Sequence, residues 1–390
     1  MNYILADFQK HNALLPFTYT RPTSELRCGI LTLKEKWEKH LDTQVSFLTQ
    51  DYLQTKYPLK ETTDNVVIAG NLFATAALCE AINKLELGQQ LVHNEILIAY
   101  RASTSQVAIE TLEQVHFNGD CDGIFNTWDI FSKNGKALEA DYDLITAGRT
   151  SQPIPETVQA LNASRIFIEE GAVLQFATLN ASTGCIYIGK DAEVMEGTLI
   201  RGSFALCEHS ATKLGTKVYG PTTVGPHSKI GGEVNNSVIF GYSNKGHEGF
   251  LGNSVIGEWC NLGADTNTSN LKNNYAEVKL WDYETGRFAP TGLQFCGLMM
   301  GDHSKCGINT MFNTGTVVGV SANIYGAGYP RNFVPSFVWG GPQGTMTYKT
   351  NKAYEVADVV MKRRGLSLEQ VDIAILDAIF EATKSYRKDD

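Results

Sequence analysis

One series of apolar residues, spaced six apart, limits what the second half of this chain can fold into. A spacing of six fits neither a helix, at about 3.6 residues per turn, nor a strand with simple alternation. It fits a solenoid in which each six-residue unit forms one side of a triangular coil. The apolar residue then points into the prism, and a small residue after it lies near the corner. The series is Met300, Cys306, Phe312, Val318 and Ile324, with glycine at 301, 307 and 319.

Two shorter series carry the same spacing further toward the N-terminus. They are Ile188, Val194, Ile200 and Leu206, and then Ile256 with Leu262. The spacing stops over residues 264–296, a polar stretch that we expect to leave the coil as a loop or as added strands. Interruptions in a solenoid commonly lie on one functional face.

The chain divides by pattern into four segments. Residues 1–150 alternate apolar strands with helical stretches, which predicts an α/β domain with a mainly parallel sheet. Residues 151–165 are a connector, 166–345 are the solenoid, and 346–390 return to helical periodicity.

Several secondary-structure elements can be placed within these segments. We expect strands over 3–6, 65–69 and 95–100. We expect helices over 31–40, 72–85, two stretches within 135–164, 352–364 and 367–386, the last starting at a capping box of Ser367 and Gln370.

Composition excludes several classes of protein. A formal charge of −9 argues against a general nucleic-acid binder, whose surface would be basic. The chain starts without a signal peptide and holds no apolar run long enough to cross a membrane, so we expect a cytoplasmic protein. The eight cysteines are scattered without a C-x-x-C pair, which favours buried thiols over a metal site.

Residues Ser243 to Asn270, SNKGHEGFLGNSVIGEWCNLGADTNTSN, carry a resemblance to a known family. The stretch is similar to the acetyltransferase domain of bifunctional sugar-1-phosphate nucleotidylyltransferases that also acetylate amino sugars. The matching positions are His247, then Leu251 and Gly252, then Asn261, Gly263, Ala264, Thr266 and Asn270. This chain has Phe250 where family members usually have tyrosine.

The resemblance implies a left-handed parallel β-helix of hexapeptide repeats that binds acetyl-CoA and an amino-sugar phosphate, in a homotrimer. N-acyl transfer needs a base, and His247 is the natural one because its reference pKa lies near neutral pH. Asn261 and Asn270 are candidates to hold sugar hydroxyls or the reacting amine, and Gly263 and Ala264 to admit the acyl-CoA arm. Lys217, Lys229 and Lys245 are candidates for substrate phosphates.

Each of these residues also has a plain structural interpretation. A histidine in a glycine-rich loop can lie at the surface without a function, and asparagines can stack as ladders in β-helix corners. Gly263 and Ala264 suit tight corners, and a single lysine is commonly just solvated.

Residues Leu15 to Pro22, LPFTYTRP, resemble a segment of sugar-1-phosphate nucleotidylyltransferases, which implies a Rossmann-type domain. The family has a glycine-rich loop before this segment, where the chain reads ADFQKHNALL without glycine. Its metal-binding Gly-Asp appears here as Gly70 and Asn71. Gln9, Lys10, Thr18, Arg21 and Asn71 are the candidates for a nucleoside triphosphate and Mg²⁺.

Two other functions stay open at this point. A degenerate N-terminal domain would bind a sugar nucleotide without catalysis and act as a sensor or scaffold. A plain structural solenoid is disfavoured, because a spacer would not need the polar excursion at 264–296.

Overall fold

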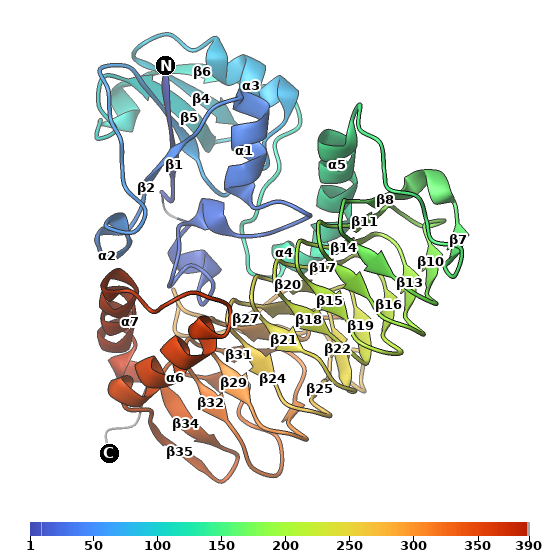
Figure 1. The fold of residues 1–390 in the computed structure, drawn as a ribbon. Coiled ribbons are helices and arrows are strands. Elements are labelled where there is room, and N and C mark those ends of the chain that lie inside the picture. Colours follow the sequence, from blue (N-terminus) through green and yellow to red (C-terminus); the bar gives the residue numbers. More distant parts are fainter. Residues whose placement is uncertain (9, 388–390) are drawn as a thin grey trace. The chain divides into compact units, whose positions relative to one another are not determined.

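A computed structural model describes residues 1–8 and 10–387. The chain forms two compact units, each described here by itself. The first comprises residues 1–14, 20–26 and 31–126; the second comprises 15–19, 27–30 and 127–390. The predicted fold class is confirmed: a Rossmann-like α/β unit, a parallel β-helix and C-terminal helices (Figure 1). None of the described helices is long and apolar enough to span a membrane.

The first unit is built on a six-stranded sheet in the order β2-β1-β3-β5-β4-β6. β5 runs antiparallel to both neighbours, β3 and β4, and the other three pairs are parallel. The strands are β1 (Asn2–Ala6), β2 (Ser46–Leu48), β3 (Asn65–Ala69), β4 (Gln89–His93), β5 (Ile96–Ala102) and β6 (Glu113–His116), and the helices are α1 (Leu33–Leu41), α2 (Asp51–Gln54) and α3 (Ala76–Asn83).

Helix α1 shows how the sequence fixes an element of this unit. The Thr32 hydroxyl accepts a hydrogen bond from the backbone N–H of Glu35, and the Glu35 carboxylate accepts one from the N–H of Thr32, a capping box. Trp37 on the same helix is fully buried, and its indole N–H donates to the carbonyl of Leu72 at 3.0 Å. The helix is therefore started by its cap and held by one large apolar side chain.

The segment between the sheet and the coil contains the short α4 (Asp129–Ser132) and then α5 (Asn134–Thr146). The second helical stretch expected within 135–164 is wrong. Pro153 and Pro155 cannot continue a helix. Residues Gln159–Leu161 instead form β7, which pairs in parallel with β10 and starts the coil.

The β-helix consists of three parallel sheets, each contributing one short strand to a coil. The first sheet holds β7, β10 (Thr178–Asn180), β13 (Leu199–Arg201), β16 (Lys217–Tyr219), β19 (Glu233–Asn235) and β22 (Phe250–Gly252). The second holds β8 (Ile166–Ile168), β11 (Ile186–Ile188), β14 (Phe204–Leu206), β17 (Thr222–Val224), β20 (Val238–Ile239), β23 (Val255–Ile256), β28 (Leu298–Met300), β31 (Thr316–Val318) and β33 (Phe333–Val334). The third holds β9 (Val173–Leu174), β12 (Glu193–Val194), β15 (Ala211–Thr212), β18 (Lys229–Ile230), β21 (Asn244–Lys245), β24 (Asn261–Leu262), β29 (Lys305–Cys306), β32 (Asn323–Ile324) and β34 (Val338–Gly341), closed by the antiparallel β35 (Gly344–Thr347).

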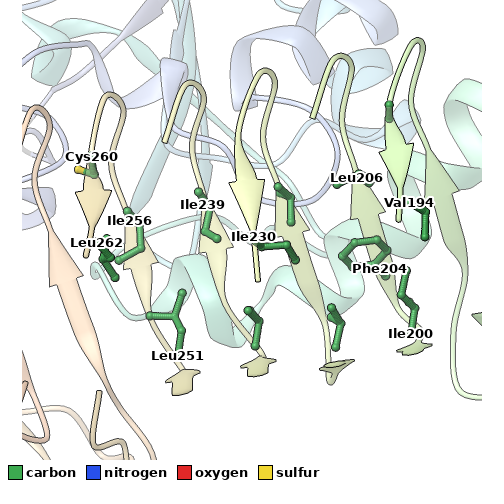
Figure 2. Close-up of a cluster of buried hydrophobic side chains, with 14 of the residues drawn as sticks. Val194, Ile200, Phe204, Leu206, Ile230, Ile239, Leu251, Ile256, Cys260 and Leu262 are labelled. Carbon is green, nitrogen blue, oxygen red and sulfur yellow. The ribbon is translucent and has the colours of Figure 1, made fainter. Parts of the chain in front are cut away.

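The core of the β-helix is a narrow stack of inward-pointing side chains that come from all three sheets. Every apolar residue of the six-residue series belongs to this cluster of buried residues, which confirms the pattern read from the sequence. Figure 2 shows several of them stacked from coil to coil, from Val194 and Leu206 to Ile256 and Leu262. The prism is too narrow for a second layer, so each coil contributes only a few core residues.

The polar excursion leaves the coil later than its sequence suggested. The coil continues through β25 (Asn267–Thr268), which pairs with β30 (Met311–Phe312). The excursion proper then forms an antiparallel hairpin of β26 (Lys279–Asp282) and β27 (Arg287–Pro290). Its Trp281 ring stacks on Phe333 with ring centroids 4.2 Å apart, so the hairpin packs on the last coils.

A column of stacked rings runs along the corner between the second and third sheets. Its members are His209, His227, Tyr242, Trp259 and His303, one from each successive coil. Neighbouring ring centroids lie 4.2 to 6.2 Å apart, with interplanar angles of 20° or less. All five residues have a positive φ, so the same turn recurs in every coil and places the rings in register.

Two C-terminal helices pack on the β-helix: α6 (Thr350–Lys362) and α7 (Gln370–Ala382). The predicted capping box of Ser367 and Gln370 is wrong, because the helix begins only at Gln370 and Ser367 lies outside its first turn. Glu369 is the cap, paired with Asp372. Phe380 of α7 packs edge-on against Phe337, and the Arg364 guanidinium after α6 donates to the carbonyl of His227 at 3.3 Å.

The ring column makes stability depend on pH. Burial, together with the neighbouring His209 imidazole and Arg364 guanidinium, lowers the pKa of His227 below its usual 6.5, while Glu208 opposes this. The unfolded chain therefore takes up a proton at His227 before the folded chain does, so stability is full above about pH 6.5 and is lost as pH falls. We expect the melting temperature of wild type to fall more steeply than that of His227→Phe between about pH 7.5 and pH 5.5.

The His227→Phe variant keeps a ring in the column and removes only the titration. His116→Gln, at an exposed histidine of the first unit, is the matched control and should follow wild type. Parallel curves for wild type and His227→Phe would contradict the assignment.

Candidate functional site

The corner between the third and first sheets departs from the regular repeat at one place. In regular coils paired residues lie 18 positions apart, as Ala211 and Lys229 do. Lys229 and its next partner Asn244 are only 15 apart. Two of the three missing residues come from this corner, where only Gly231 and Gly232 join β18 to β19. The turn at 231–232 is therefore two residues shorter than a regular one, and we call it the cut corner.

Three turns at this corner have four residues, and the fourth is a threonine whose hydroxyl closes the turn internally. The hydroxyl of Thr216 donates to the carbonyl of Lys213 at 2.6 Å. Thr266 donates to Gly263 at 2.6 Å, and Thr310 donates to Gly307 at 2.8 Å. These hydroxyls satisfy a carbonyl that is shielded from water.

The turn after the cut corner, residues 246–249, has no threonine; we call it the His247 turn. Its fourth residue is Gly249, with a φ of 117°. A Cβ at Gly249 would lie 2.2 Å from the Thr266 carbonyl oxygen, so a threonine does not fit. Two successive corners, at 231–232 and at 246–249, thus lack the hydroxyl that closes the turns ending at Thr216, Thr266 and Thr310.

Lys245 supplies the missing hydrogen-bond donors from inside the coil. Its side chain takes the inward position that Ile230 holds in the coil before and Leu262 in the coil after, and the residue is only 3% exposed. The ammonium donates to the carbonyls of Gly231 at 3.0 Å and His247 at 2.6 Å. Burial lowers the pKa of Lys245 to about 8, while Glu248 and Asp265 oppose this.

His247 itself is exposed at the tip of the turn, as the predicted base requires. Glu248 beside it forms an ion pair with Lys217, with Nζ and Oε2 3.6 Å apart. The Glu248 carbonyl accepts a hydrogen bond from the N–H of Asp265 at 3.1 Å, which stacks the His247 turn on the next coil.

This stacking brings Gly263 and Ala264 to the same corner as His247. Because Asn244 pairs with Asn261, His247 lies level with Ala264 of the following coil. A Cβ at Gly263 would lie 2.5 Å from the Gly307 carbonyl oxygen, so glycine is required here by the coil itself. Asn261 is exposed two residues earlier, on the outer face of β24.

Two predicted residues lie away from the His247 turn. Asn270 lies at the next corner, where its amide donates to the Asn253 side chain at 2.8 Å, an asparagine ladder of the kind expected in β-helices. Lys229 lies two coils before Asn261 on the outer face of the third sheet, where its pKa is lowered by burial and by Arg364.

The inward lysine and the acidic neighbours Glu248 and Asp265 were missed as a group by sequence reasoning. The signal that would have found them is the register. Once coils of 15 and 17 residues are allowed, Lys245 takes a core position between Ile230 and Leu262. A lysine at such a position demands a polar partner.

In the first unit, the loop after β1 is organised by the buried Asp7. Its carboxylate accepts hydrogen bonds from the backbone N–H and hydroxyl of Thr23 at 2.7 and 2.9 Å, from the Thr49 hydroxyl at 2.5 Å, and from His11 Nδ1 at 3.0 Å. His11 Nε2 lies 3.3 Å from the Tyr52 hydroxyl. Asp7 thus ties the loop to two neighbouring segments.

The predicted nucleotide-site residues are placed as follows. The Asn71 amide is buried and donates to the carbonyl of Ile124 at 3.1 Å, and the Lys10 ammonium lies 5.8 Å from the centre of the Phe125 ring. Arg21 is buried in the first unit, whereas Thr18 belongs to the second. Gln9 lies outside the described residues.

Mg²⁺ does not fit the residues of this region. The ion prefers carboxylate oxygens with lone pairs to spare. The carboxylate of Asp7 is already filled by four hydrogen bonds, and the Asn71 amide holds the chain at Ile124. Over residues 1–8 and 10–387, no group of three or more His, Cys, Asp or Glu residues is arranged to hold a metal ion.

Comparison with known proteins supports the first unit most directly. A family model described as sugar nucleotidyl transferase matches residues 3–150. A bifunctional sugar-1-phosphate nucleotidylyltransferase/acetyltransferase of Sulfurisphaera tokodaii is 33% identical over 144 residues, 36% of this chain and 35% of that protein. The bifunctional protein GlmU of Methanococcus maripaludis is 27% identical over 219 residues, 56% of this chain and 46% of that protein.

Among solved structures, a UDP-N-acetylglucosamine acyltransferase from Campylobacter jejuni aligns with a TM-score of 0.34 and 13% identity, over 60% of this chain and 83% of that one. The matched part spans between about a third and a half of the length of these two curated relatives. Residues 3–150 thus match a sugar nucleotidyl transferase domain, and parts of the chain are similar to bifunctional sugar-1-phosphate nucleotidylyltransferase/acetyltransferases.

Proposed function

We propose that this protein is a transferase of sugar-nucleotide metabolism whose β-helix transfers an acetyl group from acetyl-CoA to the amine of an amino-sugar phosphate. The observation that carries the proposal is the exposed imidazole of His247, level with Ala264 in the turn that follows the shortened corner at Gly231 and Gly232. The relatives named as acetyltransferases support the same reaction class.

In the proposed reaction, the substrate amine attacks the carbonyl carbon of the thioester. His247 accepts the proton that the nitrogen loses, the C–S bond breaks, and the thiolate leaving group takes up a proton. Gly263 and Ala264 leave the corner narrow, which suits the passage of an acyl-CoA arm. Asn261, exposed on the adjoining strand, is the candidate to bind a sugar hydroxyl.

Two of the predicted lysines differ in whether they can reach a substrate phosphate. Lys217, half-buried and paired with Glu248 beside the turn, is the best placed of the three predicted lysines to approach a substrate phosphate. Lys245 points inward and is withdrawn from that role. We place the reaction in the cytoplasm.

The test of His247 is acetyl transfer from acetyl-CoA to glucosamine 1-phosphate and related amino-sugar phosphates. We expect His247→Ala to lower kcat about 10²- to 10⁴-fold, the usual contribution of a general base, with KM for acetyl-CoA nearly unchanged. His209→Ala, an exposed histidine of another corner, is the control and should retain activity. Equal rates for His247→Ala and wild type would remove His247 as the base.

For the first unit, the residues favour sugar-nucleotide binding without nucleotidyl transfer. The side chains of Asp7 and Asn71 both make hydrogen bonds that hold the fold. We expect no release of pyrophosphate from any nucleoside triphosphate mixed with sugar 1-phosphate and Mg²⁺. Calorimetry with nucleoside diphosphate sugars should still detect binding. Mg²⁺-dependent turnover would refute the proposal and show that this unit catalyses nucleotidyl transfer.

A homotrimer belongs to the same proposal, because the resembled enzymes form their CoA sites between neighbouring β-helices. The narrow prism leaves large side chains outside it, among them Leu199, which is 52% exposed. Sedimentation equilibrium should give the mass of three chains. A monomer that acetylates the sugar would show that one chain holds a whole site.

A further inference from the structure

The inward position of Lys245 is unusual for a residue of its type. The same position is held by Val194, Ile230, Leu262 and Ile324 in other coils. Burying an ammonium costs several kcal/mol unless it is well hydrogen-bonded, on the order of the whole stability of a small domain. Such a residue therefore needs a compensating interaction, which Lys245 finds in the carbonyls of Gly231 and His247.

Those two carbonyls belong to two successive corners that lack the closing threonine. One is the tight turn of Gly231 and Gly232, and the other is the His247 turn itself. The ammonium thus joins the main chain of the cut corner to that of the turn above it. Without it, the His247 turn would keep its stacking bond from Asp265 N–H to the Glu248 carbonyl but lose its internal support.

We propose that Lys245 is a positioning residue that fixes the backbone of the His247 turn and so sets the place of the imidazole. The proposal rests on the proposed acetyl transfer, in which His247 acts as base. It assigns Lys245 no contact with substrate, and it corrects its role from phosphate binding to support of the turn.

The charges that face the ammonium come from three coils. Glu248 and Asp265 favour its charged form, as does the Cys306 thiol two coils further on, and Lys217 opposes it. Because the pKa of Lys245 is lowered to about 8, the ammonium loses a proton as pH rises through that value. The hydrogen bonds to the two carbonyls then weaken, since a charged donor binds more strongly than a neutral one.

The first experiment compares wild type with Lys245→Met in the full chain. Hydrogen–deuterium exchange of the two amides that donate to carbonyls of the His247 turn, those of Asp265 and Glu233, should rise about tenfold or more, while the coil around β14 stays protected. In the acetyl-transfer assay kcat should fall about 10- to 100-fold with little change in KM for acetyl-CoA, as expected for a displaced base. Thr212→Val, an inward residue of the same column, is the matched control and should leave both readouts unchanged.

The second experiment uses Lys245→Gln, which keeps an N–H donor but does not titrate. The ratio of wild-type kcat to that of Lys245→Gln should decrease as pH rises through about 8, because only the wild-type donor loses its charge. The ratio cancels the other effects of pH on the reaction, which both proteins share.

The outcomes separate the two claims. Unchanged exchange of the Asp265 and Glu233 amides in both Lys245 variants would overturn the positioning role, as would a kcat ratio that is constant across pH 8. If wild type transfers no acetyl group, the proposed function fails, while the exchange data still decide whether Lys245 fixes the turn.

Discussion

The β-helix depends on one constraint, the need to satisfy main-chain groups at every corner while coils stack directly on one another. Parallel strands hydrogen-bond to the coils above and below, but the carbonyls inside a turn have no strand partner. Threonine hydroxyls meet this need at Thr216, Thr266 and Thr310. Where the chain departs from that solution, the departure identifies the candidate site, since a plain scaffold has no reason to exchange a hydroxyl for a buried lysine.

Much of the fold follows from the sequence because it rests on local pattern. The residues of the six-residue series are all buried in the core, as predicted. The helix capped by Thr32 and Glu35 begins within two residues of its expected first residue. The second helix expected before the coil failed because tertiary pairing of β7 outweighed local propensity, with two prolines already against a helix. The N-cap of the last helix lies two residues after the expected Ser367, because Glu369 and Asp372 form the capping box there.

The candidate site was predictable only in part. His247, Gly263 and Ala264 lie together because they share a local motif and one corner. Asn270 was grouped with them by the motif and Lys229 as a candidate for a phosphate, yet Asn270 lies at the next corner and Lys229 lies two coils before Asn261. The role of Lys245 depends on coil lengths of 15 and 17, a property of the register between coils that single-residue patterns do not carry.

The cut corner at Gly231 and Gly232 has a consequence for how such a site can arise. One turn is two residues shorter than its regular counterparts, and the candidate site lies at the turn that follows it. A deletion in a repetitive coil is a small genetic step that leaves the strands on either side intact. A repeat protein can thus acquire a site at one coil of an otherwise uniform prism by losing residues. The position of the deletion decides which coil carries the site.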